Sequence, residues 1–447
     1  MRTRLKGLVS AALESLWFVP LAMLAVSQAL VLPALLTGVE PSAALSLAGL
    51  DEFAERVREL ESGYDAGAAR DLLTMIAGGM VTVISIVFSL SFVALTLTSQ
   101  QIGPRIIDFW LQANVTQALI GLSLSAFFAA LSGLLVLTQG EPGGAASLTA
   151  VLIASALGGL TLVAVVLFAT RMSEAIRADA TVARVGDLFV GAVVADRAPR
   201  ADAAEVRDAE ALEALARAEG RAIPAASAGY LAAVDLDGLA EWARGHGLRL
   251  VLVARENDHL LPGAPLALAV GMHDADGTRG VEDALRARLA LTPRRRRTGV
   301  ADFEGDALSE IAMRALSPSL NDPFTAMACL DRILEGCLRL ARRGPPSRLR
   351  REPGGAAVLA APGCGAAWLA PRLIHPIIHA GRDHAQVLET AARGLSALRE
   401  VAAVPEDRDA AARLIARVAR AAEALGDPDD RALVQRALAS GDGRQEG

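Results

Sequence analysis

Three histidines lie close together near the C-terminus, and imidazole nitrogens are common zinc ligands. His375, His379 and His384 fall within ten residues, next to Asp383. Two histidines four residues apart on a helix share one face and can hold a metal ion. The segment has neither an HExxH motif nor an outer glutamate, and Pro376 suits a helix start. We therefore expect a surface helix with incidental histidines and no metal site.

A stripe of small polar residues lies inside the apolar segment 72–98. At about 100° per residue, its members fall within roughly 60° of one another on a helix. Such a face can pack helices closely, or line an aqueous path around an axis of identical subunits. Helix packing is the favoured interpretation and the pore is the alternative. The stripe consists of Gly78, Thr82, Ser85, Ser89 and Thr96.

The richest constellation lies in residues 302–340, which read DFEGDALSEIAMRALSPSLNDPFTAMACLDRILEGCLRL. Ser317-Pro318 ends one helix, because a residue before proline resists helical geometry. Asp322 at the N-cap and Pro323 at the first helical position begin another. The predicted buried faces are Phe303, Leu308, Ile311, Ala312, Ala315 and Leu316 on the first helix, and Phe324, Met327, Ala328, Leu330, Ile333, Leu334 and Cys337 on the second.

The elbow between these helices holds Arg314, Asn321 and Asp322, whose side chains could bind a ligand or an ion. Capping already occupies the carboxylate of Asp322, and Arg314 can pair with it or with Glu310. We favour a structural elbow. A ligand site, or a contact with the inner ends of membrane helices, is the alternative.

Composition excludes several chemistries. Lys6 is the only lysine, so neither a P-loop lysine nor a Schiff-base lysine is available. Cys329, Cys337 and Cys364 form no CxxC pair, which fits a reducing compartment and no zinc ribbon. The net charge of −6 gives no indication of a nucleic-acid partner. We find no nucleophile–base pair, cofactor motif or small-molecule ligand, and predict a protein that is not an enzyme.

The elements that carry these residues begin with four apolar segments in the first 170 residues. A run of about 20 apolar residues spans a bilayer core. The segments carry no charge apart from Glu14 at one edge, and they predict a four-helix transmembrane domain over residues 1–170. Their bounds are Leu13–Leu36, Leu72–Thr98, Val115–Thr138 and Ala145–Thr170.

Charge around the segments predicts the orientation, because Lys and Arg concentrate on the cytoplasmic side. Arg2, Arg4 and Lys6 precede the first segment, and the loop 37–70 is acidic. We predict a multi-pass protein of the bacterial inner (plasma) membrane with cytoplasmic N- and C-termini. Apolar residues in Leu50–Leu60 have helical spacing, which indicates a short helix in the external loop.

Two residues after the second segment are typical of the inner membrane interface. Arg105 can meet lipid phosphates, and the indole of Trp110 can anchor among the headgroups.

The remaining chain predicts a cytoplasmic α+β region with a small β module, so the fold class is membrane α-helical plus α+β. Alternation and β-branched residues indicate strands at Gly229–Asp235, Leu248–Ala254 and Pro265–Gly271, with a helix at Leu236–His246. The predicted parts are a helical connector 171–228, a β-containing module 229–290, the signature helix-turn-helix 298–342 and C-terminal helices 366–440.

The β module resembles the barrel-sandwich modules of biotinyl and lipoyl carriers in its segments AGYLAAVD and ENDHLLPGAPLALAV. The carrier function cannot transfer, because the module has no lysine. Four consecutive arginines, Arg294–Arg297, follow it. A solvated loop is the favoured interpretation, and contact with anionic headgroups is the alternative.

Two motifs carry a wider resemblance. IAMRALSPSLNDPFTAMACLD in the signature and SLSFVALTLTSQQIGPRIIDFW at the end of the second segment resemble the domain of unknown function 2254 family of bacterial membrane proteins. The resemblance implies an integral membrane location and this architecture, and it implies no catalytic activity or cofactor. Glu304 stands where the family often has glycine, which affects the expected first turn of the signature helix.

These observations predict a non-enzymatic structural or regulatory protein of the lipid bilayer. Self-association is expected, since the second segment offers a small-residue face. The alternative is an oligomeric ion channel lined by that segment. The segments contain no charged residue except Glu14, and pumps or ion-coupled transporters usually need one inside the membrane.

Overall fold

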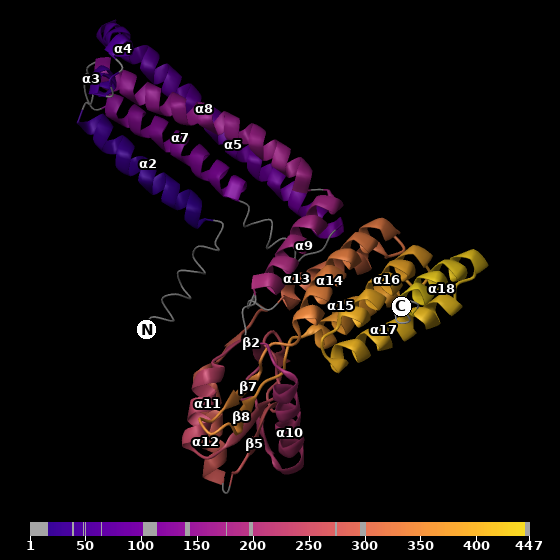
Figure 1. Cartoon of the computed structure of the whole chain (residues 1–447). Coiled ribbons are helices and arrows are strands. Elements are labelled where there is room, and N and C mark those ends of the chain that lie inside the picture. The colour runs from indigo at the N-terminus through magenta and orange to yellow at the C-terminus, as the bar shows by residue number, and fades with distance from the viewer. Residues whose placement is uncertain are drawn as a thin grey trace. The chain divides into compact units, whose positions relative to one another are not determined.

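The computed structural model describes residues 17–37, 40–47, 49, 51–63, 65–101, 114–138, 144–175, 177–195, 200–272, 275–295 and 301–442. The chain forms two compact units, Met1–Ala180 and Thr181–Gly447 (Figure 1). Each unit contains buried hydrophobic clusters of its own. The units are therefore described separately.

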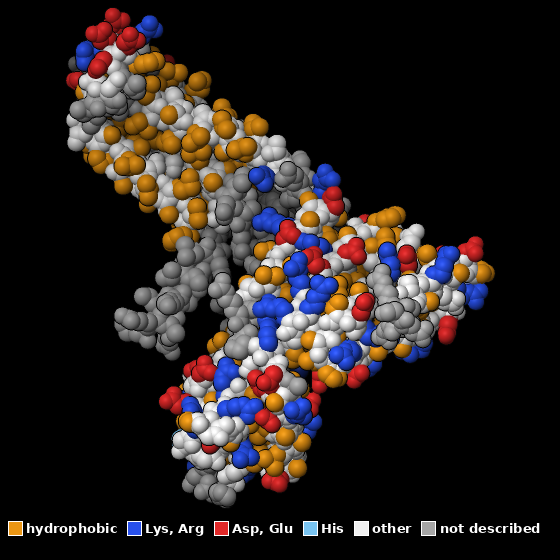
Figure 2. Space-filling view, viewed as in Figure 1, with side chains coloured by type: hydrophobic (Ala, Val, Ile, Leu, Met, Phe, Trp, Pro, Cys, Tyr) orange, Lys and Arg blue, Asp and Glu red, His pale blue; other side chains and the backbone are white. Residues whose placement is uncertain are grey.

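The first unit contains the predicted membrane helices. They are α2 (Phe18–Leu36), α5 (Ala66–Gln101), α7 (Asn114–Thr138) and α8 (Gly144–Ala175). All four are long and apolar enough to cross a membrane, which confirms the predicted segments by length and composition. Hydrophobic side chains cover much of their surface (Figure 2), and Leu30 is 69% exposed. Apolar surface on this scale is unfavourable in water and suits lipid.

Helix α7 is the centre of this bundle, since it packs against α2, α5 and α8. Glycines allow the close approach. A Cβ on Gly121 would lie 3.1 Å from the Cα atom of Pro20, and one on Gly133 would lie 2.9 Å from the Cβ of Ala150. Ser132 of α7 donates a 2.9 Å hydrogen bond to Gln28 of α2. Small residues and cross-helix hydrogen bonds hold membrane helices together, and here α7 provides them.

Two short helices connect α2 to α5. They are α3 (Pro41–Leu47) and α4 (Asp51–Gly63). Helix α4 confirms the helical spacing in Leu50–Leu60. It packs against α3 and α8, and Ala54 is its buried contact residue.

In the second unit, a five-stranded sheet has the order β1-β5-β3-β8-β7. Strands β3 and β8 are parallel, with Leu250 opposite Leu359, and the other pairs are antiparallel. The strand bounds are β1 Arg221–Pro224, β3 Arg249–Leu252, β5 Pro265–Val270, β7 Leu349–Arg351 and β8 Ala357–Ala360.

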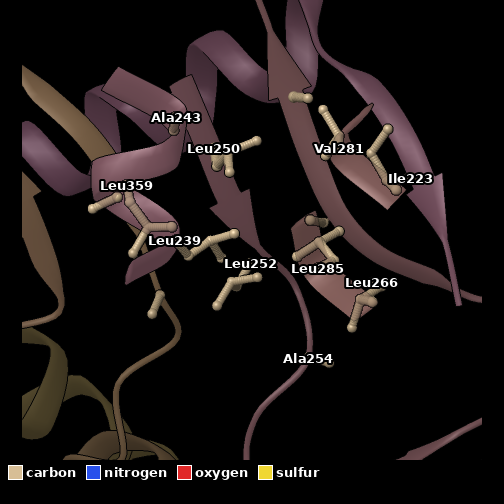
Figure 3. Packing of buried hydrophobic residues seen from close by; sticks show 14 of the residues in the cluster. Ile223, Leu239, Ala243, Leu250, Leu252, Ala254, Leu266, Val281, Leu285 and Leu359 are labelled. Atoms are coloured by element: carbon tan, nitrogen blue, oxygen red, sulfur yellow. The ribbon is translucent and has the colours of Figure 1, made fainter. Parts of the chain in front are cut away.

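Successive side chains of a strand point to opposite faces of the sheet, and apolar residues on both faces of this sheet are covered by helices. Leu250 and Leu252 point toward α11 (Leu236–Gly245) and α12 (Ala275–Arg288) and join their buried cluster (Figure 3). Val251 lies on the opposite face, with Leu212 of α10 (Ala203–Glu219). Burial on both faces explains the nearly continuous apolar runs of β3 and β5.

A second sheet has three strands in the order β4-β2-β6. They are β2 (Gly229–Val234), β4 (His259–Leu260) and β6 (Leu289–Thr292). The strands predicted near residues 229, 248 and 265 and the helix predicted at 236 are confirmed. The first segment of the barrel-sandwich resemblance forms β2, and the second segment forms β4, which pairs with β2, and β5, which belongs to the other sheet. We call both sheets with α10–α12 the sheet module.

The other helices of the second unit form a helical layer. They are α9 (Ala178–Ala195), α13 (Asp302–Ala315), α14 (Pro323–Arg343), α15 (Ala366–Ala380), α16 (Ala385–Val401), α17 (Pro405–Glu423) and α18 (Pro428–Asp442). Helix α14 packs against α13, α15 and α16. Phe189 of α9 is fully buried against Gly305 and Gly336, so glycines of α13 and α14 make room for its ring.

Candidate functional site

The signature elbow is a compact turn held by its own backbone. The carbonyl of Ser317 accepts the N–H groups of Leu320 at 3.1 Å and Asn321 at 2.9 Å. Asn321 has φ 47°, a left-handed conformation that asparagine tolerates better than most residues. The carboxylate of Asp322 accepts the N–H of Thr325 at 3.1 Å and its hydroxyl at 2.6 Å. The predicted cap, with Pro323 in the first turn, is confirmed.

The elbow is an exposed surface. Pro318 and Asn321 are exposed, while Arg314 and Ser317 are half-buried. Phe324 is 70% exposed, so the prediction that it belongs to the buried stripe is wrong. It lies in the first turn of α14, and the first fully buried residue of that helix is Ala326. Met327 and Ala328 of the predicted stripe are half-buried. The predicted buried residues of α13 are confirmed, and so are Leu330, Ile333, Leu334 and Cys337 of α14.

The histidines are distributed over two helices. His375 and His379 lie on α15, whereas His384 is the N-cap residue of α16. The Nε2 atom of His375 contacts the guanidinium of Arg417, and burial, then Arg417, then His379 lower the pKa of His375. Pro376 lies inside α15, so the prediction that it starts a helix is wrong. No metal-binding group of three His, Cys, Asp or Glu residues occurs among the described residues.

The small-residue stripe of α5 faces away from the centre of the bundle. Buried Leu73, Met80 and Val87 recur every seven residues on one face, and the whole stripe is exposed on the opposite face. Thr82 and Ser85 donate their hydroxyls to backbone carbonyls four residues earlier, at 3.2 and 2.8 Å. The residues of the predicted inner interface, Arg105 and Trp110, lie outside the described residues.

Sequence reasoning missed a buried network of charges between the sheet module and the helical layer. Arg295 pairs with Asp302 and Asp306. Arg372 of α15 donates to Asp306 at 3.0 and 2.8 Å. Asn257 donates its amide to Asp302 at 3.0 Å. The expectation of a solvated arginine loop is therefore wrong for Arg295, whose partner Asp302 is only 1% exposed. The signal was the i, i+4 pair of aspartates on one face of α13.

The two aspartates respond differently to burial. Burial raises the pKa of Asp302, although Arg295 and Asn257 oppose the shift. Burial also acts to raise the pKa of Asp306, but hydrogen bonds from Arg372 and Arg295 outweigh it and hold that pKa below its usual value. Arginine partners make these carboxylates structural links rather than free acids or bases.

Beside this network lies a cleft of about 240 Å³. Most of its lining is apolar, from both the sheet module and the helical layer, and Arg255, Glu256, Arg348 and Cys364 are its charged or reactive residues. Burial raises the pKa of Glu256. Burial also raises the pKa of Cys364 to about 12, so its thiol stays protonated and is a poor nucleophile at neutral pH. The lining of the cleft therefore suits binding of a small molecule better than nucleophilic attack on it.

Comparison with known proteins agrees with these observations. Residues 13–397 match the family described as predicted membrane protein, domain of unknown function 2254. An uncharacterized protein of Mycobacterium tuberculosis is 28% identical over 387 residues, covering 83% of this chain and 72% of the relative. An uncharacterized protein of Mycobacterium bovis has the same identity and coverage. No solved structure matches the chain. The chain therefore belongs to the DUF2254 family of predicted membrane proteins.

Proposed function

We propose that this protein is a non-enzymatic structural or regulatory protein of the bacterial inner membrane, with its second unit and both termini in the cytoplasm. The observation that carries the proposal is the opposite surface character of the two units. The first unit exposes apolar side chains along four membrane-length helices. The second unit buries its apolar residues between sheet and helices. A membrane anchor joined to a folded, water-compatible unit suits a structural or regulatory role at the membrane.

The chemistry of the second unit supports binding rather than turnover. The carboxylates of Asp302 and Asp306 are engaged by arginines. Burial raises the pKa of Cys337 to about 12, as it does for Cys364, so these thiols stay neutral.

Reporter fusions test the orientation. Alkaline phosphatase is active outside the cytoplasm and a fluorescent protein is fluorescent inside it. We expect a C-terminal fusion to fluoresce, and a phosphatase inserted between α3 and α4 to be active. Active phosphatase at the C-terminus would contradict the cytoplasmic placement while leaving membrane anchorage intact.

A second candidate function is an ion channel in a homo-oligomer, lined by α5. The observation that favours it is the exposure of the hydroxyl stripe on the face opposite the buried residues Leu73 and Met80. That face is available to a neighbouring copy. Because the hydroxyls of Thr82, Ser85 and Thr96 already bond to their own helix, these positions can also face lipid at little cost.

Flux and stoichiometry distinguish these functions. A channel predicts ion flux in liposomes that is altered when Thr82, Ser85 and Ser89 are replaced by leucine. Thr170→Leu is the matched control, since Thr170 is an exposed residue of α8 bonded to its own backbone. A structural or regulatory protein predicts no flux and stable co-purifying partners. A monomer by light scattering in detergent would exclude a pore on a symmetry axis.

A further inference from the structure

The cleft in the second unit joins parts of the chain that are distant in sequence. Val193 of α9 and Leu340 of α14 line it from the helical layer, and Leu252 and Ala254 line it from the sheet module. Its volume of about 240 Å³ is slightly below the range of roughly 300–1,000 Å³ for drug-sized ligands. A compact ligand in this space would contact both parts at once.

Two arginines of the cleft approach the same backbone segment. The Nε atom of Arg255 lies 3.5 Å from the carbonyl oxygen of Gly363. The side chain of Arg348 packs on the same residue, because a Cβ on Gly363 would lie 3.2 Å from its Cδ and 3.8 Å from its Nε. Two positive groups are thereby concentrated on one wall.

These guanidinium groups are weakly neutralised. Arg348 has its carboxylate partner, Glu213, at 3.6 Å, longer than a good charge-assisted hydrogen bond. Arg255 has no ion pair among the described residues, and its Cζ lies 5.2 Å from the ring centroid of Trp368. An aromatic wall orients the guanidinium without consuming its donors, as in many anion sites.

Glu256 is the acidic residue of the lining. It accepts a hydrogen bond from the backbone of Val234, while burial and then the charge of Asp302 raise its pKa. The lining itself holds two arginines and one glutamate, and Glu213, Asp258 and Asp302 add negative charge around it. The positive charge is therefore local to the two guanidinium groups beside Gly363. The remaining lining is mostly apolar, which favours a ligand with an acidic group and a hydrophobic body.

We propose that this cleft binds a small organic anion, a carboxylate or phosphate attached to a compact apolar group, and that Arg255 and Arg348 bind its acidic group. This site would supply the signal for the proposed regulatory role, and its biological purpose rests on that proposed function. A ligand that contacts α9, α14 and the sheet module together stabilises one arrangement of these elements by mass action. Helix α9 begins three residues after the end of α8 in the chain.

Binding can be measured by fluorine NMR on the full-length protein in a neutral detergent. The probes are 4-fluorobenzoate, 4-fluorophenyl phosphate and the uncharged 4-fluorobenzamide. We expect at least one anion to bind with Kd below about 1 mM, and the amide to bind at least about tenfold more weakly. Preference between the two anions identifies the acidic group.

Variants locate the site. Arg255→Gln and Arg348→Gln are each expected to weaken binding at least about tenfold. Arg255→Lys keeps the charge and is expected to retain part of the affinity. Arg286→Gln is the matched control, because Arg286 is exposed on α12 in a surface pair with Asp283, and it should bind like the wild type. Ala192→Phe fills the cleft without removing a charge and should abolish binding.

The proposal is overturned if neither anion binds up to about 10 mM, or if both glutamine variants and Ala192→Phe bind like the wild type. Melting curves from tryptophan fluorescence show whether each variant is folded. Should one glutamine variant fail to fold, the other and the filled cleft still decide the outcome. Loss of this inference leaves the membrane orientation, tested by the fusions, unaffected.

Discussion

The carboxylate of Asp322 serves as a helix cap at the elbow. Both carboxylate oxygens are engaged by Thr325 of the following turn. Asp322→Ala removes both bonds, and a lost N-cap costs about 0.5–2 kcal/mol. We expect a lower thermal midpoint by tryptophan fluorescence in detergent. Asp202→Ala is the comparison variant, since Asp202 accepts the N–H of Glu205 at the start of α10, and loss of that cap should also lower the midpoint. An unchanged midpoint for Asp322→Ala would point to a role other than capping.

Asp407 gives a pH-dependent prediction. It is 1% exposed, and its Oδ1 atom accepts the N–H of Ala367 at 2.6 Å. Burial, with a smaller contribution from Glu406, raises its pKa from 3.8 to about 6. The folded state therefore binds this proton more tightly than the unfolded state. Its contribution to stability is complete below pH 3.8 and is lost as the pH rises to about 6.

Asp407→Asn should remove this dependence. At about 1.4 kcal/mol per pKa unit, the variant is expected to gain up to about 3 kcal/mol over the wild type above pH 6. Little of this gain should remain near pH 4. Melting curves of both proteins from pH 4 to 7 measure the difference. If the difference in melting midpoint between the two proteins stayed constant from pH 4 to 7, Asp407 would have a normal pKa.

At the scale of elements, glycines position α9 against α13 and α14. A Cβ on Gly336 of α14 would collide with the ring of Phe189. Gly336→Ala is therefore expected to destabilise the second unit by about 1–3 kcal/mol, the usual cost of overpacking. Gly191→Ala is the matched control. No atom lies within 4 Å of a Cβ at that position, and alanine stabilises a helix by roughly 0.5–1 kcal/mol relative to glycine.

Thermal melting followed by Trp242 and Trp368, which lie in the second unit, should separate the two variants. The Gly336 variant should melt lower than the wild type and the Gly191 variant slightly higher. Equal midpoints for both would show that Phe189 can move aside.

The membrane helices illustrate what a local sequence pattern can and cannot predict about an element. Length and composition located them, because spanning a bilayer constrains a continuous segment of chain. Which face of each helix is buried was not predictable, since apolar residues lie on several faces of all four helices. The sequence favoured the stripe on α5 as a helix-packing face, yet the close contacts between helices occur at Gly121 and Gly133 of α7. Which small residue faces a neighbour is decided by the neighbour, and no local pattern records it.

At the scale of the whole molecule, the chain should behave as an integral membrane protein. Exposed apolar residues such as Leu30, Phe92 and Val166 surround the helices of the first unit, and their burial in lipid is the main force that anchors it. After washing membranes with alkaline carbonate, the protein should stay in the pellet. Neutral detergent should release it. Recovery from the carbonate supernatant would contradict the assignment of the four spans.

The sequence by itself determined what depends on neighbouring residues: the four apolar spans, the cap and proline that start α14, and the strand positions of β2, β3 and β5. It was wrong for Phe324 and Pro376, because burial and helix continuity there depend on surrounding elements. Only the tertiary structure decided that β8 lies beside β3, that Arg295 is buried with two aspartates, and that Arg255 and Arg348 meet at Gly363. The reason is physical, since these contacts depend on how separate elements pack against one another, and local propensity contains no information about that packing.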